Sequence, residues 1–524
     1  MKSFLSIFSG LVLGILNGFD RLVFRGNLKQ LCYREGMEIF LCANHVLYKD
    51  FKKHSTAQTE RLIQASFEEA KRLERPIVYL TSAKESKEER ARALAAQQGI
   101  EEGLICIFKC VERCSTFFLH RNRQTKLLEI QPKVGQCSFL YRYAFHPVFG
   151  FMSARIQTWY PFSVQICLNG REWLGRQLDR IGMPYERRDN KFLWVKDFAV
   201  AQQLLDQQLQ VHWPELLNGI LKDVHPSHPE LLGRMPMDYY WTVFQSEWAS
   251  DIAFRSAADL GRLYPQWLRH ATNYSSTDVF RFLGRKLTPD GKIWTRFEKE
   301  IKSSMTRRAE GVRIKHWVDH NSIKMYDCDR VLRIETTLND PGDFRVFRPK
   351  QGGPEEDKDW RPLRKGVADL YRRAEVSQAA NERYAAATAA VKDTTPLSTW
   401  AEPLCRRAPA PGKNAQRKVR GLNPLATDDA ALLTAVLDPK FTVNGLRNRD
   451  LVAALYDKPA TTDKERRRRS GRVTRQIRML RGHGLLHKVP KTHRYVISET
   501  GRKTITALLA ARSANADFLT KKAA

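Results

Sequence analysis

Residues 311–347, GVRIKHWVDHNSIKMYDCDRVLRIETTLNDPGDFRVF, predict three or four short antiparallel strands. The segments Asp319-His320-Asn321 and Cys328-Asp329-Arg330 are typical of the tight turns that join such strands. Read with a period of two, one face is apolar and carries Val312, Ile314, Val318, Ile323, Met325, Leu332, Ile334 and Leu338. The other face carries Arg313, Lys315, Trp317, Lys324, Tyr326, Arg333, Glu335 and Thr337. This stretch predicts an antiparallel sheet in an α+β fold.

The polar face of this sheet has the composition of a surface that handles phosphate groups. It gathers two lysines, two arginines and a tyrosine around one carboxylate, Glu335. Cations can hold a phosphodiester backbone, and a carboxylate can carry a divalent metal. An ordinary solvated sheet face also mixes charges, and that simpler interpretation stays open.

The charge of the chain indicates a polyanionic partner. Its 524 residues have a formal net charge of +31, from 88 Lys and Arg against 57 Asp and Glu. Residues 401–524 alone hold 27 basic and 10 acidic residues, so more than half of the excess lies in less than a quarter of the chain. A field of this size favours nucleic acid as the partner. The 42% hydrophobic content predicts folded domains rather than disorder.

The N-terminal segment, residues 1–17, is apolar after Lys2 but shorter than the roughly 20 residues of a membrane span. A signal peptide is the alternative, although Phe19-Asp20-Arg21 follows in place of a small-residue cleavage site. We expect a buried or dimer-forming helix, in a protein that does not bind a membrane and could form a homo-oligomer.

The nine cysteines, an odd number, favour a reducing cytoplasm. Cys106, Cys110 and Cys114 lie four residues apart, but no matched second pair of ligands follows them. We expect buried structural cysteines there rather than a zinc site.

Residues 136–167 interleave aromatic and basic side chains along predicted strands. Such strands can stack bases while holding phosphates, and they can equally supply rings to a core. His146 and Arg155 are the candidate nucleic-acid contacts in this region.

Residues 238–256, DYYWTVFQSEWASDIAFRS, are interpreted as a helix. Glu247 and Asp251 stand at positions i and i+4 and would share one helix face. With a third ligand from elsewhere they could bind a divalent cation, Mg²⁺ or Mn²⁺. Solvation, or pairing with Arg255, is the alternative.

Residues 428–520 predict three helices, over 428–437, 446–456 and 468–481, followed by a basic hairpin. This order resembles the winged helix-turn-helix domain, whose third helix enters the major groove and whose hairpin contacts the backbone or minor groove. The resemblance implies DNA contacts from Arg472, Arg475, Gln476, Arg478, Lys488, Lys491, His493 and Arg494. A winged helix can also be a protein-interaction fold.

Composition and pattern together divide the chain into five segments. We expect an apolar helix with a lead-in strand over 1–35, an α/β domain over 36–230, a helix with an antiparallel-sheet core over 231–391, a basic proline-rich linker over 392–427 and a winged helix-turn-helix domain over 428–520.

Two resemblances extend this interpretation. The phrases FDRLVFRG, FGFMSARIQTW, NGREWL and AEVSQAANERY resemble a family of uncharacterised bacterial proteins of similar length, which implies no particular activity. The segment NSIKMYDCDRVLRIETTL resembles the strand pair of rolling-circle plasmid and phage replication initiators. That likeness implies that Glu335 helps bind a metal, that Tyr326 is a candidate nucleophile and that Arg333 and Lys324 hold the scissile phosphate. Tyr239 and Tyr240 are alternative nucleophiles.

We therefore expect a cytoplasmic nucleic-acid-binding protein, with DNA as the main partner. The leading hypothesis is an initiator- or transposase-like enzyme that cuts or joins DNA with Mg²⁺ or Mn²⁺. The alternatives are a non-catalytic DNA-binding regulator and an RNA-binding protein of a mobile element that uses the strands of residues 136–167.

Overall fold

The computed structural model describes residues 1–81, 86–225, 227–308, 311–350, 353–354, 356–389, 397–411, 416–438, 441, 445–456, 458–490 and 492–513. The chain forms two compact units. The first consists of Met1–Arg285 and Lys299–Val391, and the second of Lys286–Glu298 and Lys392–Ala524.

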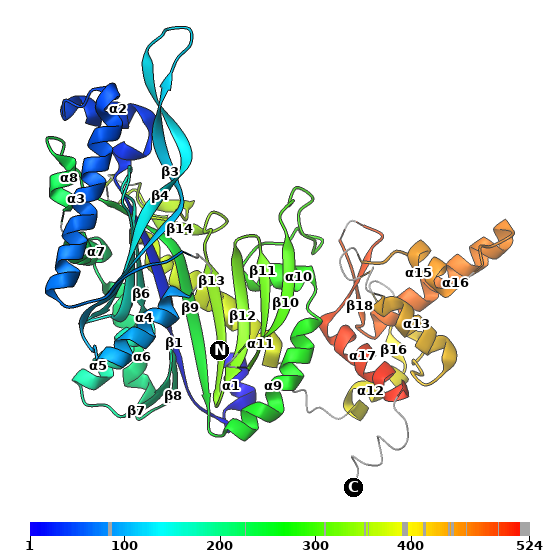
Figure 1. Ribbon diagram of the computed structural model, residues 1–524. Coiled ribbons are helices and arrows are strands. Elements are labelled where there is room, and N and C mark those ends of the chain that lie inside the picture. The colour runs from blue at the N-terminus through cyan, green and yellow to red at the C-terminus, as the bar shows by residue number, and fades with distance from the viewer. Residues whose placement is uncertain are drawn as a thin grey trace. The chain divides into compact units, whose positions relative to one another are not determined.

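A single sheet organises the first unit (Figure 1). Among the described residues it has eleven strands, in the order β10-β11-β12-β13-β9-β1-β6-β5-β4-β3-β2. Every neighbouring pair is antiparallel except β2 (Ile77–Tyr79) with β3. The two long strands β1 (Val12–Asn27) and β9 (Tyr240–Phe254) pair at its centre. The fold is therefore mixed α/β with a mostly antiparallel sheet, as the α+β prediction required.

The strands on the two sides of the β1–β9 pair repeat one connectivity. On one side, β1 is followed by the meander β3 (Gly103–Arg121), β4 (Leu128–His146), β5 (Gly150–Gln157) and β6 (Val164–Asn169), and β6 returns to pair with β1. On the other side, β9 is followed by β10 (Ile301–Arg308), β11 (Gly311–Val318), β12 (Asn321–Cys328) and β13 (Val331–Leu338), and β13 returns to pair with β9.

Helices cover the sheet differently on its two faces. One face of β9 and β13 packs against α11 (Leu370–Ala389), with α1 (Lys2–Phe8), α9 (Ala257–Thr272) and α10 (Ser276–Phe282) beside it. On the opposite face of β1 lies α6 (Phe198–Asp206), whose Phe198 and Leu205 side chains occupy the space above Gly14 and Gly18. The hairpin formed by β7 (Tyr185–Arg188) and β8 (Lys191–Val195) lies beside α6 on this face.

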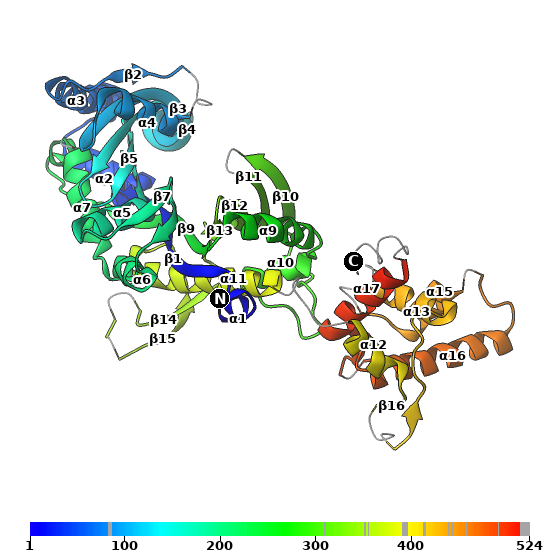
Figure 2. The same ribbon diagram turned by 90° about the horizontal axis from the view of Figure 1, so that it is seen from below.

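The remaining helices of the first unit lie around the β3–β6 side (Figures 1 and 2). They are α2 (Arg34–Ala43), α3 (Phe51–Arg72), α4 (Lys87–Gln98), α5 (Gly170–Arg180), α7 (Trp213–Val224) and α8 (His228–Leu232).

The strand and turn predictions for residues 311–338 are confirmed. Asp319 and Asp329 adopt φ of 57° and 55°, as the first residues of the two tight turns. The register then pairs Lys324 with Glu335 and Tyr326 with Arg333, so the predicted polar side chains share one face. The fourth strand differs, because β14 (Arg345–Arg348) leaves the sheet and pairs with β15 (Asp359–Pro362).

The helix prediction for residues 238–256 was wrong. Residues 240–254 form β9, which is buried on both faces along its second half, and such a strand has lost the alternation that would reveal it. The expected buried N-terminal helix is present as the short α1, which buries Phe4 and Phe8. The lead-in strand is β1, which begins at Val12, where Gly14 and Gly18 allow α6 to pack closely. Because β1 and β9 pair in one sheet, no domain boundary falls at residue 35 or 230.

The second unit has its own apolar core. Its elements are α12 (Leu397–Cys405), β16 (Ala408–Pro409), β17 (Lys418–Val419), α13 (Thr427–Leu437), α15 (Asn448–Leu455), α16 (Asp463–Gly482), β18 (Leu486–Lys488), β19 (Tyr495–Ile497) and α17 (Glu499–Ser513). Three helices and a hairpin thus follow one another as predicted, and α17 is additional. The predicted linker is not simply a tether, since Leu404 and Leu422 are buried in this core.

Other sequence expectations concern the cysteines and the membrane. Cys106, Cys110 and Cys114 lie on β3 and are buried, as expected of structural cysteines. Within the described ranges, no helix has both the length and the apolar character needed to cross a bilayer.

Candidate functional site

Three carboxylates meet on the sheet face opposite α11. Asp20 of β1, Glu247 of β9 and Glu335 of β13 each place an oxygen within 4.8 Å of the others. They come from three neighbouring strands at the centre of the sheet. Glu335 is fully buried, and Asp20 is only 8% exposed. Three carboxylates at this spacing form a candidate site for a divalent cation.

A β-bulge brings Asp20 into this cluster. In the β1–β9 register, Phe19 pairs with Trp248 and Arg21 pairs with Glu247, so Asp20 is an extra residue between them. Regular alternation would place Asp20 and Arg21 on opposite faces, whereas the bulge lets both point toward the carboxylate face. On the other face, Phe19 and Trp248 pack edge to face with ring centroids 4.9 Å apart.

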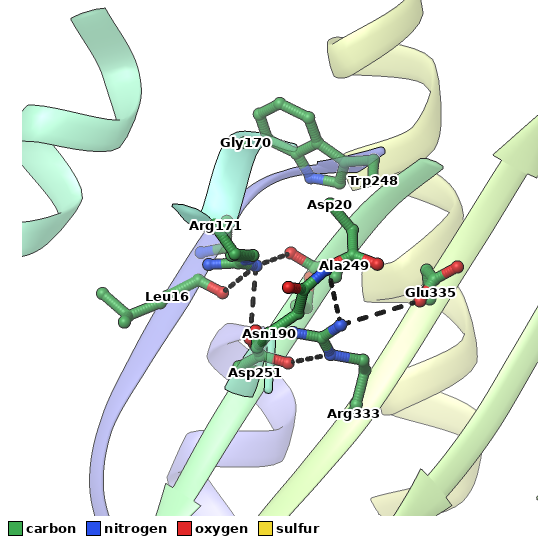
Figure 3. A network of polar contacts seen from close by, with 12 residues as sticks. Leu16, Asp20, Gly170, Arg171, Asn190, Trp248, Ala249, Asp251, Arg333 and Glu335 are labelled. Carbon is green, nitrogen blue, oxygen red and sulfur yellow. Dashed lines mark hydrogen bonds and ion pairs between the residues drawn. The ribbon is translucent and has the colours of Figure 1, made fainter. Parts of the chain in front are cut away.

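Asp251, predicted as a metal ligand, is instead held by arginines (Figure 3). Arg333 Nε and Nη2 lie 2.5 and 2.7 Å from its two carboxylate oxygens. Arg171 Nη2 lies 3.3 Å from Oδ2 and also donates to the carbonyl oxygen of Ala249 at 2.9 Å. Because strand residues advance about 3.3 Å each, Asp251 stands about 13 Å from Glu247 on the same face. The proposed Glu247–Asp251 helical pair is therefore wrong.

Arg333 is a structural centre of the network rather than a free phosphate-binding group. Beyond its bidentate contact with Asp251, its Nη1 donates to Asp20 Oδ1 at 2.9 Å, and its Nη2 donates to the carbonyl oxygen of Asn190 at 2.5 Å. All three guanidinium nitrogens are thus engaged, and the residue is 1% exposed. The Asn190 side chain in turn donates to Asp20 Oδ1 at 3.0 Å and fixes that carboxylate. These contacts hold Arg333 within the network, and its contact with a scissile phosphate stays a prediction.

Glu335 has the polar environment expected of a metal ligand. Its Oε1 forms an ion pair with Lys324 Nζ at 2.5 Å, and its Oε2 lies 3.9 Å from Arg333 Nη1. Among the described residues, neither oxygen forms a hydrogen bond of regular geometry. A buried carboxylate with unused acceptor capacity is costly, and coordination of a cation would satisfy it. Oxygen donors of this kind suit Mg²⁺ or Mn²⁺, so the residues fit the predicted metal.

Asp20 and Glu247 differ in their affinity for protons. Burial would raise the pKa of Asp20, but Arg333 and Arg171 more than offset it and lower the pKa to about 2. Burial, with repulsion from Glu335, raises the pKa of Glu247 to about 7. Burial would lower the pKa of Lys324, yet Glu335 and Glu247 together raise it. Glu247 therefore gains or loses its proton near neutral pH.

Tyr326 lies on the same face but in a poor position to ionise. It is 6% exposed, and burial raises its pKa well above the usual value. The ammonium groups of Lys191 and Lys324 lie 5.5 and 5.9 Å from its ring centroid. Of the alternative tyrosines, Tyr239 is buried and donates to the carbonyl oxygen of Phe162 at 2.7 Å. Tyr240 lies under Lys29, whose ammonium group is 3.5 Å from the ring centroid.

His146 and Arg155 have local structural partners. His146 Nδ1 accepts the backbone N–H groups of Val148 and Phe149, which fixes the β4–β5 turn. Arg155 lies 2.8 Å from Glu112 Oε2 and stacks over Phe139, with its guanidinium carbon 3.7 Å from the ring centroid.

In the second unit, Arg472, Arg475 and Arg478 are exposed on α16, and Gln476 is half-buried. Arg472 pairs with Asp428 at 2.8 Å. Lys488 and His493 are exposed, Arg494 is half-buried, and Lys491 lies outside the described residues.

Sequence reasoning missed Asp20, Arg171 and Asn190, which complete the site. A usable signal was present at Phe19-Asp20-Arg21, where two adjacent charges interrupt an apolar strand and thereby indicate a bulge.

Comparison of the chain with protein-family models, with curated proteins and with solved structures finds no match.

Proposed function

We propose that this protein is a metal-dependent enzyme that cuts or joins phosphodiester bonds in DNA. The observation that carries the proposal is the convergence of Asp20, Glu247 and Glu335, whose oxygens lie within 4.8 Å of one another. The ion pair of Lys324 with Glu335 adds a cation that could bind a phosphate oxygen. Carboxylates that hold a metal beside a lysine are suited to phosphoryl chemistry.

Each residue of the site has a distinct role in this proposal. Asp20, Glu247 and Glu335 would hold the cation, which supplies Lewis-acid polarisation of the phosphate and of an attacking water. Arg333 and Asn190 orient Asp20 through their hydrogen bonds to its Oδ1. The raised pKa of Tyr326 favours water over the phenol as the nucleophile.

DNA is the favoured substrate because of the second unit. Its α16 exposes arginines along one helix, and the β18–β19 hairpin adds Lys488 and His493. We propose that this unit acts as the predicted winged helix-turn-helix domain and delivers DNA to the enzyme.

A non-catalytic DNA-binding regulator is the second candidate, and one observation favours it. The carboxylates face a comparable number of cations, because Arg171, Arg333 and Lys324 all enter the network. A paired network of this kind can serve structure alone.

Cleavage of labelled single-stranded and duplex DNA in the presence of Mg²⁺ or Mn²⁺ separates the two candidates. Glu335→Gln keeps the shape of the side chain and removes its charge, so we expect it to abolish cleavage while DNA binding persists. Glu230→Gln, an equivalent change at an exposed position, should cleave like the parent protein. A parent protein that never cleaves, or a Glu335→Gln variant that cleaves normally, would establish the regulator.

A further inference from the structure

A concavity of about 550 Å³ opens on the β3–β6 side of the sheet. It is lined by residues of β1, β3, β4, β5 and β6, together with nearby loop residues. Strand register sets Arg25, Gln165 and Arg155 side by side across β1, β6 and β5. Arg25 follows Arg21 at even spacing along β1, so the concavity opens on the same face as the three carboxylates.

The lining has the chemistry of an anion site. Four cations contribute to it, from Arg25, Arg113, Lys133 and Arg155, and none of the lining residues in the described part of the chain is a carboxylate. Phe117 and Phe139 provide ring surfaces, and Gln157 and Gln165 provide amides. Cations with interleaved rings and amides are the groups that bind the backbone and bases of an unpaired strand.

The state of Arg25 supports the presence of an anion. Its guanidinium lies over Phe244, 4.2 Å from the ring centroid, and is half-buried. Burial lowers the pKa of Arg25, and repulsion from Arg155 lowers it further. Arg155 already pairs with Glu112 Oε2 at 2.8 Å, so a phosphate bound in the concavity would chiefly balance the charges of Arg25, Arg113 and Lys133.

The position of the concavity relates it to the carboxylates. Arg21 pairs in register with Glu247, and Arg25 lies four residues further along β1. At 3.3 Å for each residue this separation is roughly 13 Å. A nucleic-acid strand bound at Arg25 could therefore run along this sheet face toward the three carboxylates.

We propose that this concavity binds the phosphate backbone of single-stranded DNA. Its volume is that of a small-molecule pocket, which suits a few unpaired nucleotides rather than a duplex. The choice of DNA rests on the proposed function, whereas the preference for an unpaired polyanion rests on the lining itself.

Binding of a fluorescein-labelled single-stranded DNA hexamer to the full-length protein in EDTA tests this proposal. The double variant Arg113→Gln/Lys133→Gln changes two exposed side chains and should leave the fold intact. We expect it to weaken binding about tenfold and to lower the slope of log K against log salt by about 1.4, or about 0.7 for each lost phosphate contact. Arg25→Gln should weaken binding as well.

The matched control is Arg255→Gln/Lys222→Gln, which removes two exposed charges outside the concavity. It should bind within twofold of the parent protein. An equal loss in the control would show that the general charge of the protein binds DNA, and unchanged binding by the Arg113→Gln/Lys133→Gln variant would show that the concavity does not. Tighter binding of the matching RNA hexamer would overturn the choice of DNA. Because EDTA removes the metal, none of these results depends on whether the carboxylates are catalytic.

Discussion

Each of the two central strands carries a buried aspartate, and the two have different surroundings. Asp20 in DRLVFRG lies on β1 and Asp251 in DIAFRS lies on β9, and both accept hydrogen bonds from Arg333 on the same side of the sheet. Asp251 follows regular alternation and pairs directly with Arg333 across the β9–β13 register. Asp20 sits in a bulge and meets Glu247 and Glu335. One extra residue thus separates a carboxylate that pairs with arginines across the sheet from one that joins the cluster of three carboxylates.

The largest expected effect is at Asp251. Asp251→Asn would leave Arg333 and Arg171 buried beside a neutral group, so we expect the free energy of unfolding to fall by about 3–5 kcal/mol. Urea denaturation of the full-length protein, followed by tryptophan fluorescence, measures this loss. The exposed pair of Arg330 with Glu186 supplies the control, and Arg330→Gln should cost about 1 kcal/mol or less. A similar small loss at Asp251 would remove the distinction between the two aspartates.

A somewhat smaller effect should appear in the pH dependence of stability without metal. The pKa of Glu247 rises from 4.5 to about 7 on folding, so the folded protein binds the extra proton between these values. As the pH rises from 4.5 to about 7, ionisation of Glu247 in the folded protein therefore lowers the free energy of unfolding by about 3 kcal/mol. Asp20 has the opposite effect on the pH dependence of stability. Folding lowers its pKa from 3.8 to about 2, so its contribution to the free energy of unfolding is lost as the pH drops below 3.8.

Thermal unfolding from pH 4.5 to 7.5 in EDTA, for the parent protein and Glu247→Gln, would test this assignment. The variant should lose most of the decline between pH 4.5 and 7. A decline of the same size in both proteins would assign the titration to another group.

Metal binding should give the smallest effect, and it should sharpen the comparison of Asp20 with Asp251. Mn²⁺ at one hundred times its dissociation constant should raise the free energy of unfolding by about 2.7 kcal/mol. Asp20→Asn should lose this increment, because it removes one of the three anionic ligands. Denaturation with and without Mn²⁺ gives the difference for each protein, and an undiminished increment in Asp20→Asn would place the ion elsewhere.

Part of this structure could be predicted from sequence because the signal was local. The β11–β13 strands alternate strictly and end in turns at Asp319 and Asp329, so their faces and pairing followed from the pattern. The same alternation identified Lys324 and Glu335 as neighbours on one face.

The rest depended on contacts between distant segments. β9 is buried on both faces along its second half, and a spacing of four residues fits a helix face as well as a strand face. Glu247 and Asp251 therefore suited a helix as well as the strand that they occupy. The partners of Asp20 lie 170 to 313 residues away in Asn190 and Arg333, and no local pattern indicates them. The order of helices and strands in the second unit was predictable because its segments are short and its turns are marked.

The bulge at Asp20 also bears on how this protein could change by mutation. Loss of the single codon for Asp20 would leave Arg21 opposite Glu247 and would keep Val23 and Arg25 on the faces they now occupy. The strand would then be regular, and its pairing with β9 would survive. One in-frame deletion would thus remove one of the three clustered carboxylates and keep the strand pairing of the sheet.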